Sequence, residues 1–286
     1  MVAERRRSRK QRNGEMGKLF VGTALTTVAL IAVTIGLYVY LTTKGPPLRD
    51  QATFCPLDGP TAITVVLLDN SDPLPRPAKE QVLKLLGDIV DEMPEYALLE
   101  VRVLEQGPLN PELSGHTSGR QVFSLCNPGD GRGLNEFTGN PALAKKKWKE
   151  RFREPLDRVL SANLTPQPSK ISPLLATFQG IAVERFTGKA VEKIPKSMIV
   201  VSDMIENTRE YTQYPSASRV DLSYQRYKKS SAYLKYRTDL QGADVWILRV
   251  PRLPPSVLDP LAHIQFWVDW VQDNRGHFLK AIRLQG

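Results

Sequence analysis

Polar side chains that could bind a ligand follow two apolar runs typical of buried parallel strands. Asp69 and Ser71 come directly after the run 62–68, and Asp203 ends the run 196–203. The carboxyl ends of parallel strands meet at one edge of an open α/β sheet, which is where such sheets bind their ligands. Carboxylate and hydroxyl oxygens are the ligands that Mg²⁺ prefers. The residue types therefore predict a shared ligand or cation site, although these side chains lie far apart in the sequence.

The elements that would position this site alternate between strand and helix, which predicts a doubly wound α/β sheet with helices on both faces. The expected strands are 62–68, 97–105, 121–126, 196–203, 243–250 and 277–285. The expected helices are 77–92, 141–160, 173–187, 221–238 and 258–273. Ser172 is expected to cap the helix that starts at Pro173.

The first 41 residues predict a membrane anchor ahead of this domain. Residues 1–18 hold seven basic and two acidic side chains, and 19–41 hold no charged one. As a helix, the second segment would be about 34 Å long, enough to cross a bilayer core. Its length, and the lack of a small-residue cleavage site, favour a single-pass signal anchor over a cleaved signal peptide. The basic tail then stays in the cytoplasm, which predicts an inner-membrane protein with a linker at 42–60 and a periplasmic domain at 61–286.

Three short motifs, in the order of the predicted elements, resemble those of the von Willebrand factor A domain. DNSDP (69–73) resembles that family's D-x-S-x-S, SPLLATFQGIA (172–182) its T-P-L segment, and VVSDMIE (200–206) its S-D-G. The resemblance covers about residues 60–286, and it implies one antiparallel edge strand in the sheet. It also implies a cation site for Mg²⁺, formed by Asp69, Ser71, Ser172 and Asp203, with Asp72 and Glu206 as candidate further carboxylates.

Two interpretations of these residues stay open. In the first, they bind the cation, although Pro73 stands at the last serine of the motif and has neither a hydroxyl nor a backbone N–H. In the second, the residues are structural: Asp69 and Ser71 cap the following turn, and Asp203 accepts hydrogen bonds from nearby backbone N–H groups.

The resemblance also bears on the two cysteines, Cys55 and Cys126. If the third strand, 121–126, is antiparallel, Cys126 lies at the end of the sheet where the first strand starts. Cys55 lies shortly before that strand, and residues 56–62 can reach about 23 Å when extended. Export would allow a disulfide to persist. We therefore expect a Cys55–Cys126 disulfide on the membrane-proximal side of the domain.

The sequence favours a binding or scaffold protein over an enzyme. It contains no recognisable catalytic constellation and no evident site for a small-molecule cofactor, and domains of the family it resembles are mostly adhesive or scaffolding. We expect the edge that carries Asp69 to recruit an exported protein partner. Tyr211 and Tyr214 are the expected contact residues, because tyrosine is enriched in binding hot spots.

Two other functions are kept as alternatives. A Mg²⁺-dependent hydrolase would use Asp69 and Asp203, with Asp72 or Glu206 as the general base. An envelope DNA-handling protein would use the basic segments 145–158 and 224–237. The first of these segments also carries acidic residues, and an exported domain seldom meets nucleic acid, so nucleic acid is not the expected partner.

Overall fold

The computed structural model describes residues 25–38, 47–105, 117–134, 139–214 and 222–285. The chain divides into two units, Met1–Pro47 and Leu48–Gly286, and each is described by itself. In the first unit, residues 25–38 are helical, while both ends of the predicted span 19–41 lie outside the described residues. Among the residues that are described, no helix is long and apolar enough to span a bilayer. The membrane anchor stays a prediction.

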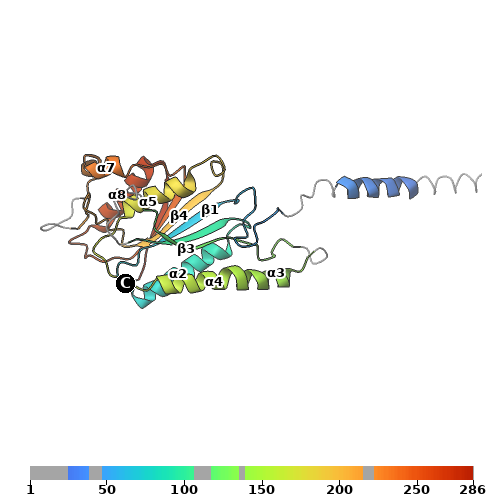
Figure 1. The fold of residues 1–286 in the computed structure, drawn as a ribbon, viewed down its shortest axis with the longest axis horizontal. Coiled ribbons are helices and arrows are strands. Elements are labelled where there is room, and N and C mark those ends of the chain that lie inside the picture. The colour runs from blue at the N-terminus through green and yellow to red at the C-terminus, as the bar shows by residue number, and fades with distance from the viewer. Residues whose placement is uncertain (1–24, 39–46, 106–116, 135–138, 215–221, 286) are drawn as a thin grey trace, which may run out of the picture. The chain divides into compact units, whose positions relative to one another are not determined.

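The second unit is built on one six-stranded sheet (Figure 1). The strands are β1 (Ile63–Leu68), β2 (Leu98–Val103), β3 (Arg120–Cys126), β4 (Lys196–Ser202), β5 (Asp244–Arg249) and β6 (His277–Arg283). Their order across the sheet is β3-β2-β1-β4-β5-β6, and all neighbours are parallel except β2 and β3. The mostly parallel sheet with one antiparallel edge strand is therefore confirmed.

Helices cover both faces of the sheet (Figure 1). They are α2 (Arg76–Asp91), α3 (Pro141–Trp148), α4 (Glu154–Asn163), α5 (Leu174–Ile181), α6 (Tyr224–Lys228), α7 (Ser231–Lys235) and α8 (Pro260–Asp273). Successive strand residues face opposite sides of a sheet. In β1, Val66 and Leu68 therefore pack with α2, α3 and α4, whereas Val65 and Leu67 pack with the helices from α5 to α8.

Three of the predicted helices differ from expectation in detail. A π-helical turn, Lys149–Arg153, joins α3 to α4 within the helix expected at 141–160, and α5 continues into a second such turn, Ala182–Phe186. The helix expected at 221–238 is instead two short helices, because Ser230 adopts an extended backbone and starts α7 anew.

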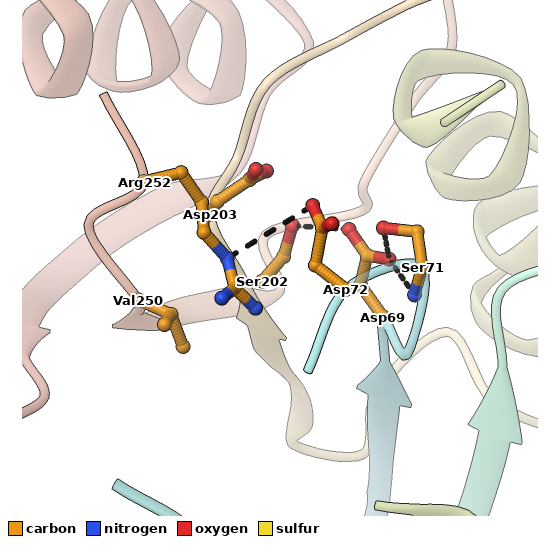
Figure 2. Close-up of a pocket in the computed structure, with 7 residues that line it drawn as sticks. All are labelled: Asp69, Ser71, Asp72, Ser202, Asp203, Val250 and Arg252. Carbon is orange, nitrogen blue, oxygen red and sulfur yellow. Dashed lines mark hydrogen bonds and ion pairs between the residues drawn. The ribbon is translucent and has the colours of Figure 1, made fainter. Parts of the chain in front are cut away.

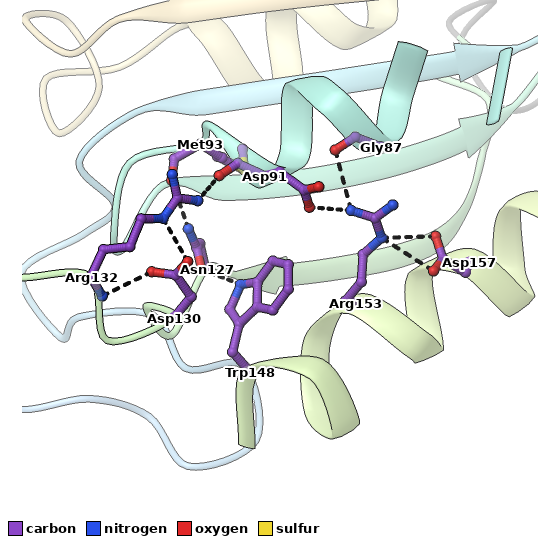
Figure 3. A network of polar contacts seen from close by, with 9 residues as sticks. All are labelled: Gly87, Asp91, Met93, Asn127, Asp130, Arg132, Trp148, Arg153 and Asp157. Carbon is purple, nitrogen blue, oxygen red and sulfur yellow. Dashed lines mark hydrogen bonds and ion pairs between the residues drawn. The ribbon is translucent and has the colours of Figure 1, made fainter. Parts of the chain in front are cut away.

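A polar network fastens the ends of α3 and α2 to the loop after β3, and it fastens the π-helical turn to α2 (Figure 3). The indole N–H of Trp148 donates to Asn127 Oδ1 at 2.9 Å, and the Asn127 amide donates to the Met93 carbonyl at 2.8 Å. Arg153, in the π-helical turn, forms ion pairs with Asp91 and with Asp157. These contacts tie α3 and α4 to α2 at the end of the sheet where β3 finishes.

The predicted disulfide is confirmed. Cys55 and Cys126 are bonded, with their Cα atoms 4.9 Å apart. Cys126 is the last residue of antiparallel β3 and pairs with Leu98, the first residue of β2. The carboxyl edge is the end of the sheet where β1 and β4 finish. The disulfide therefore lies at the opposite end of the sheet. The backbone N–H of Cys126 also donates to the Thr53 carbonyl at 2.8 Å, which holds the incoming chain against β3.

Candidate binding site at the carboxyl edge of the sheet

Asp69 directly follows β1, and hydroxyl groups surround its carboxylate (Figure 2). Oδ1 accepts hydrogen bonds from the Ser71 hydroxyl at 2.6 Å and the Ser71 backbone N–H at 3.1 Å. Oδ2 accepts one from the Ser202 hydroxyl at 2.7 Å and a longer one from the Ser172 hydroxyl at 3.5 Å. Both carboxylate oxygens of this buried side chain therefore already have donors from the protein.

Asp203 follows β4, the strand next to β1, and its buried carboxyl lines the same pocket as Asp69. Its Oδ1 accepts a hydrogen bond from the Ile205 backbone N–H at 2.8 Å. Burial, followed by the negative charge of Asp69, raises the pKa of Asp203 to about 7, because both effects disfavour its ionised form. Asp203 therefore keeps its proton to a higher pH than a solvent-exposed aspartate does.

Met204 stands where the resemblance expects glycine, and its backbone adopts a φ of +66°. This left-handed conformation is strained for a residue with a side chain. The Met204 carbonyl accepts hydrogen bonds at 2.9 Å from both His263 Nε2 and Trp267 Nε1, which hold the turn in place. Burial lowers the pKa of His263 to about 4, so its imidazole is neutral and serves a structural purpose.

A small pocket opens among the ends of β1, β4 and β5 (Figure 2). It is lined by Asp69, Ser71, Asp72, Ser202, Asp203, Val250 and Arg252, and its empty volume is about 180 Å³. Arg252 Nη1 donates a hydrogen bond to the Pro73 carbonyl at 2.5 Å, and Arg252 Nε lies 3.9 Å from Asp72 Oδ2. The pocket thus contains an arginine as well as carboxyl groups.

Glu206 lies in the loop after β4 but caps a helix instead of lining this pocket. Its Oε2 accepts the Leu175 backbone N–H at 2.9 Å, at the start of α5. The prediction that Ser172 caps this helix was wrong, because α5 has no side-chain hydrogen bond from its N-cap position, which Pro173 occupies. Ser172 pairs instead with Asn207, through two backbone hydrogen bonds of 3.0 Å.

The predicted cation ligands are therefore brought together only in part. Asp69, Ser71 and Asp203 line one pocket, while Ser172 reaches it only through its long contact with Asp69. Across the described parts of the chain, no group of three or more His, Cys, Asp or Glu side chains could hold a metal ion.

The oxygen donors around the pocket do not fit a resident Mg²⁺ ion. An octahedral Mg²⁺ shell needs several free oxygen donors, but those of Asp69 are engaged with hydroxyls. Pro73 offers no hydroxyl, and its carbonyl accepts a hydrogen bond from Arg252. Mg²⁺ binding stays a prediction.

The two tyrosines predicted to contact a partner differ in their surroundings. Tyr214 is 41% exposed. Burial raises the pKa of its hydroxyl, and the negative charges of Asp203, Asp72 and Asp69 raise this pKa further. Tyr211 is half-buried, with its ring stacked on Phe266 at 5.9 Å and edge-on to Tyr227 at 5.0 Å. Tyr211 supports the core beneath the loop, and Tyr214 is the accessible member of the pair.

Sequence reasoning missed Arg252 and Ser202, although a signal for both was present. Ser202 ends β4, and Arg252 follows β5, so both had to lie at the edge that Asp69 and Asp203 share. A basic residue shortly after a strand is not a cation ligand, so the family motif, which contains carboxylates and hydroxyls, does not point to Arg252.

A buried ionic network on β2 was missed as well. Arg102 forms ion pairs with Glu100 and with Glu184, and Arg185 forms one with Glu100 at 2.7 Å. Glu100 and Arg102 are two residues apart in a strand, so they share one face, and this spacing was visible in the sequence. Their partners come from the π-helical turn after α5, which the sequence did not reveal.

The similarity of this chain to known proteins is confined to solved structures. No protein-family model matches the chain, and no curated protein matches it. Among solved structures, a von Willebrand factor type A protein from Catenulispora acidiphila is similar with a TM-score of 0.38 and 12% identity, over 80% of this chain and 39% of that one. An aerotolerance-related membrane protein from Bacteroides fragilis NCTC 9343 gives 0.34 and 15%, over 79% and 92%. At these scores the von Willebrand A-like description rests on the strand order and the antiparallel edge, not on the neighbours.

Proposed function

We propose that this chain is a membrane-anchored, exported binding or scaffold protein that recruits a protein partner through the carboxyl edge of its sheet. The observation that carries the proposal is the gathering of Asp69, Asp203 and Arg252 from three separate strand ends around one open pocket. Loops at strand ends carry function on such scaffolds. Beside the pocket, Tyr214 offers an accessible aromatic contact of the kind enriched in hot spots.

The size of the pocket favours a protein partner over a small substrate. Its empty volume of about 180 Å³ includes space that is open to solvent, so the pocket encloses little room in which a small substrate could be buried. A shallow, polar depression of this kind can instead form part of a larger contact surface with another protein.

The contacts of the edge residues argue against the hydrolase alternative. A general base would have to reach a water near Asp69. Glu206, one candidate, accepts the Leu175 backbone N–H and is fully buried. Asp72, the other, faces Arg252, whose Nε lies 3.9 Å from its Oδ2.

The disulfide supports the proposed orientation of the domain. The chain enters the domain beside Cys55, at the end of the sheet opposite to Asp69. An anchor at 19–41 would therefore be joined to the end that does not bind, and the carboxyl edge would stay accessible to an exported partner.

Site-specific photo-crosslinking tests this proposal in the full chain expressed in cells. A photoreactive amino acid in place of Tyr214 is expected to give one defined protein adduct. The same amino acid in place of Leu57, which is 69% exposed at the disulfide end, is the matched control and is expected to give none. Tyr214→Ala should then weaken the purified complex about tenfold. Adducts from position 57 alone would contradict the proposal.

A further inference from the structure

We propose that Arg252 is a built-in cation of the carboxyl edge, which takes the place that a divalent cation has in the domains this chain resembles. The positive charge of Arg252 balances the carboxyl groups of the pocket whether or not a partner binds there. Three features assign this role to Arg252: its tether, the groups around it, and the hydrogen bonds that already engage the pocket oxygens.

The tether of Arg252 is formed by the residue that breaks the metal motif. Pro73 replaces the last serine of D-x-S-x-S and so removes one hydroxyl ligand. The Pro73 carbonyl accepts a hydrogen bond from Arg252 Nη1 at 2.5 Å. Position 73 thus lacks the hydroxyl ligand, and its backbone carbonyl, which any residue would offer there, holds the guanidinium.

The groups around Arg252 are those that a cation would neutralise. Arg252 Nε faces Asp72, 3.9 Å from its Oδ2, and Asp69 and Asp203 line the same pocket (Figure 2). The Arg252 side chain is only 22% exposed, so bulk water screens its positive charge only in part. Arginine is permanently charged and more weakly hydrated than an ammonium group, which suits it to a partly buried site. Arg249, buried at the end of β5, adds a second positive charge behind this edge.

A divalent cation would have to compete with this arrangement. It would need to take the Asp69 oxygens from the hydroxyls of Ser71 and Ser202, and it would lie against the guanidinium of Arg252. Repulsion between the two cations would weaken metal binding for as long as Arg252 stays in the pocket. Removing the charge of Arg252 should therefore allow a divalent cation to bind, because Asp69 and Asp203 would remain without a positive charge to neutralise them.

Metal titration of the full chain tests the inference, with MgCl₂ or MnCl₂ alone as the probe. The variants are Arg252→Gln, the double variant Arg252→Gln/Asp69→Ala, and Arg158→Gln, which removes an exposed arginine from α4 as a charge-matched control. In wild type and R158Q, 10 mM metal should leave the thermal midpoint unchanged. In R252Q it should raise the midpoint by about 3–5 °C, which corresponds to roughly tenfold stabilisation of the folded state. The double variant should lose this rise.

Direct Mn²⁺ binding to the wild-type chain keeps the inference testable even if R252Q does not fold. Electron paramagnetic resonance of free Mn²⁺ should show no site with submillimolar affinity. A submillimolar wild-type site that Asp69→Ala abolishes would overturn the inference. A folded R252Q that gains no metal response would also overturn it.

Discussion

Removal of the Cys55–Cys126 disulfide is expected to lower the free energy of unfolding by about 4 kcal/mol. The bond joins residues that are 71 positions apart. In the chain-entropy description, a cross-link of this span removes many conformations from the unfolded chain, and losing it restores them. A loss of this size is a large fraction of the roughly 5–15 kcal/mol that stabilises a typical domain.

The native contacts around the bond explain why the folded state should survive its loss. The Cys126 N–H still donates to Thr53, and the Asp50 N–H still donates to the Cys55 carbonyl. The effect should therefore fall on stability, with the structure retained. Urea unfolding of the full chain, followed by fluorescence of the four tryptophans, measures it in wild type and in the double variant Cys55→Ala/Cys126→Ala.

Reduction of the wild-type protein provides the control for the alanine substitutions. A reducing agent should destabilise wild type by the same amount and leave the double variant unchanged. If wild type and the variant unfold within 1 kcal/mol of each other, the disulfide does not have the role assigned to it here.

Raising the pH from 4.5 to 8 is expected to destabilise the domain through Glu206, by on the order of 4 kcal/mol. Burial is the main cause that raises the pKa of this carboxyl to about 8, and the Leu175 N–H opposes it only in part. The folded state therefore keeps the Glu206 proton to a higher pH than the unfolded chain does. Because the unfolded chain gives up its proton above its ordinary pKa of 4.5, the free energy of unfolding falls as the pH rises through this window.

Glu206→Gln separates this contribution from those of other groups. Glutamine stays neutral and keeps an oxygen that can accept the Leu175 N–H, so the variant should unfold with a much flatter pH dependence. The pKa of Asp203 is also raised, to about 7, so this residue should lower the free energy of unfolding in the same direction, starting from a lower pH. Asp203→Asn serves as the control for its contribution. Parallel pH profiles for wild type and E206Q would contradict the assignment to Glu206.

The positions of strand ends were the part of the fold that the sequence predicted best. The run before Asp69 and the run before Asp203 are apolar enough to mark buried strands, and these two strands, β1 and β4, pair in the structure. Parallel geometry then places both aspartates at one edge without further information. The Cys55–Cys126 pairing followed in the same way, from the direction of β3.

The roles of individual side chains at that edge were harder to predict, because they depend on loops of variable shape. Ser172 and Pro173 form a favourable capping sequence, yet the side chain of Glu206, from another loop, accepts the hydrogen bond of the Leu175 N–H at the start of α5. Tyr211 lies in a polar segment and was expected at the surface, but its loop places its ring against Phe266. Such contacts join segments that local patterns do not relate.

The role of Arg252 in balancing charge could not be predicted from the family motifs. These motifs contain only the oxygen ligands of a metal, and they include no basic side chain that could replace it. Arg252 enters the pocket only because β5 lies beside β4 and the chain then turns back toward Pro73. The order of the strands, which the sequence does not state, decides that contact.

Hydrogen exchange of the full chain, with and without the partner captured at position 214, tests the central claim most directly. Partner binding should protect backbone amides in 69–73, 203–214 and 250–253, around the carboxyl edge. Amides in 48–58 and 127–132, at the disulfide end, should exchange at unchanged rates. Protection of the disulfide end, with none at the carboxyl edge, would contradict the claim that this edge is the binding surface.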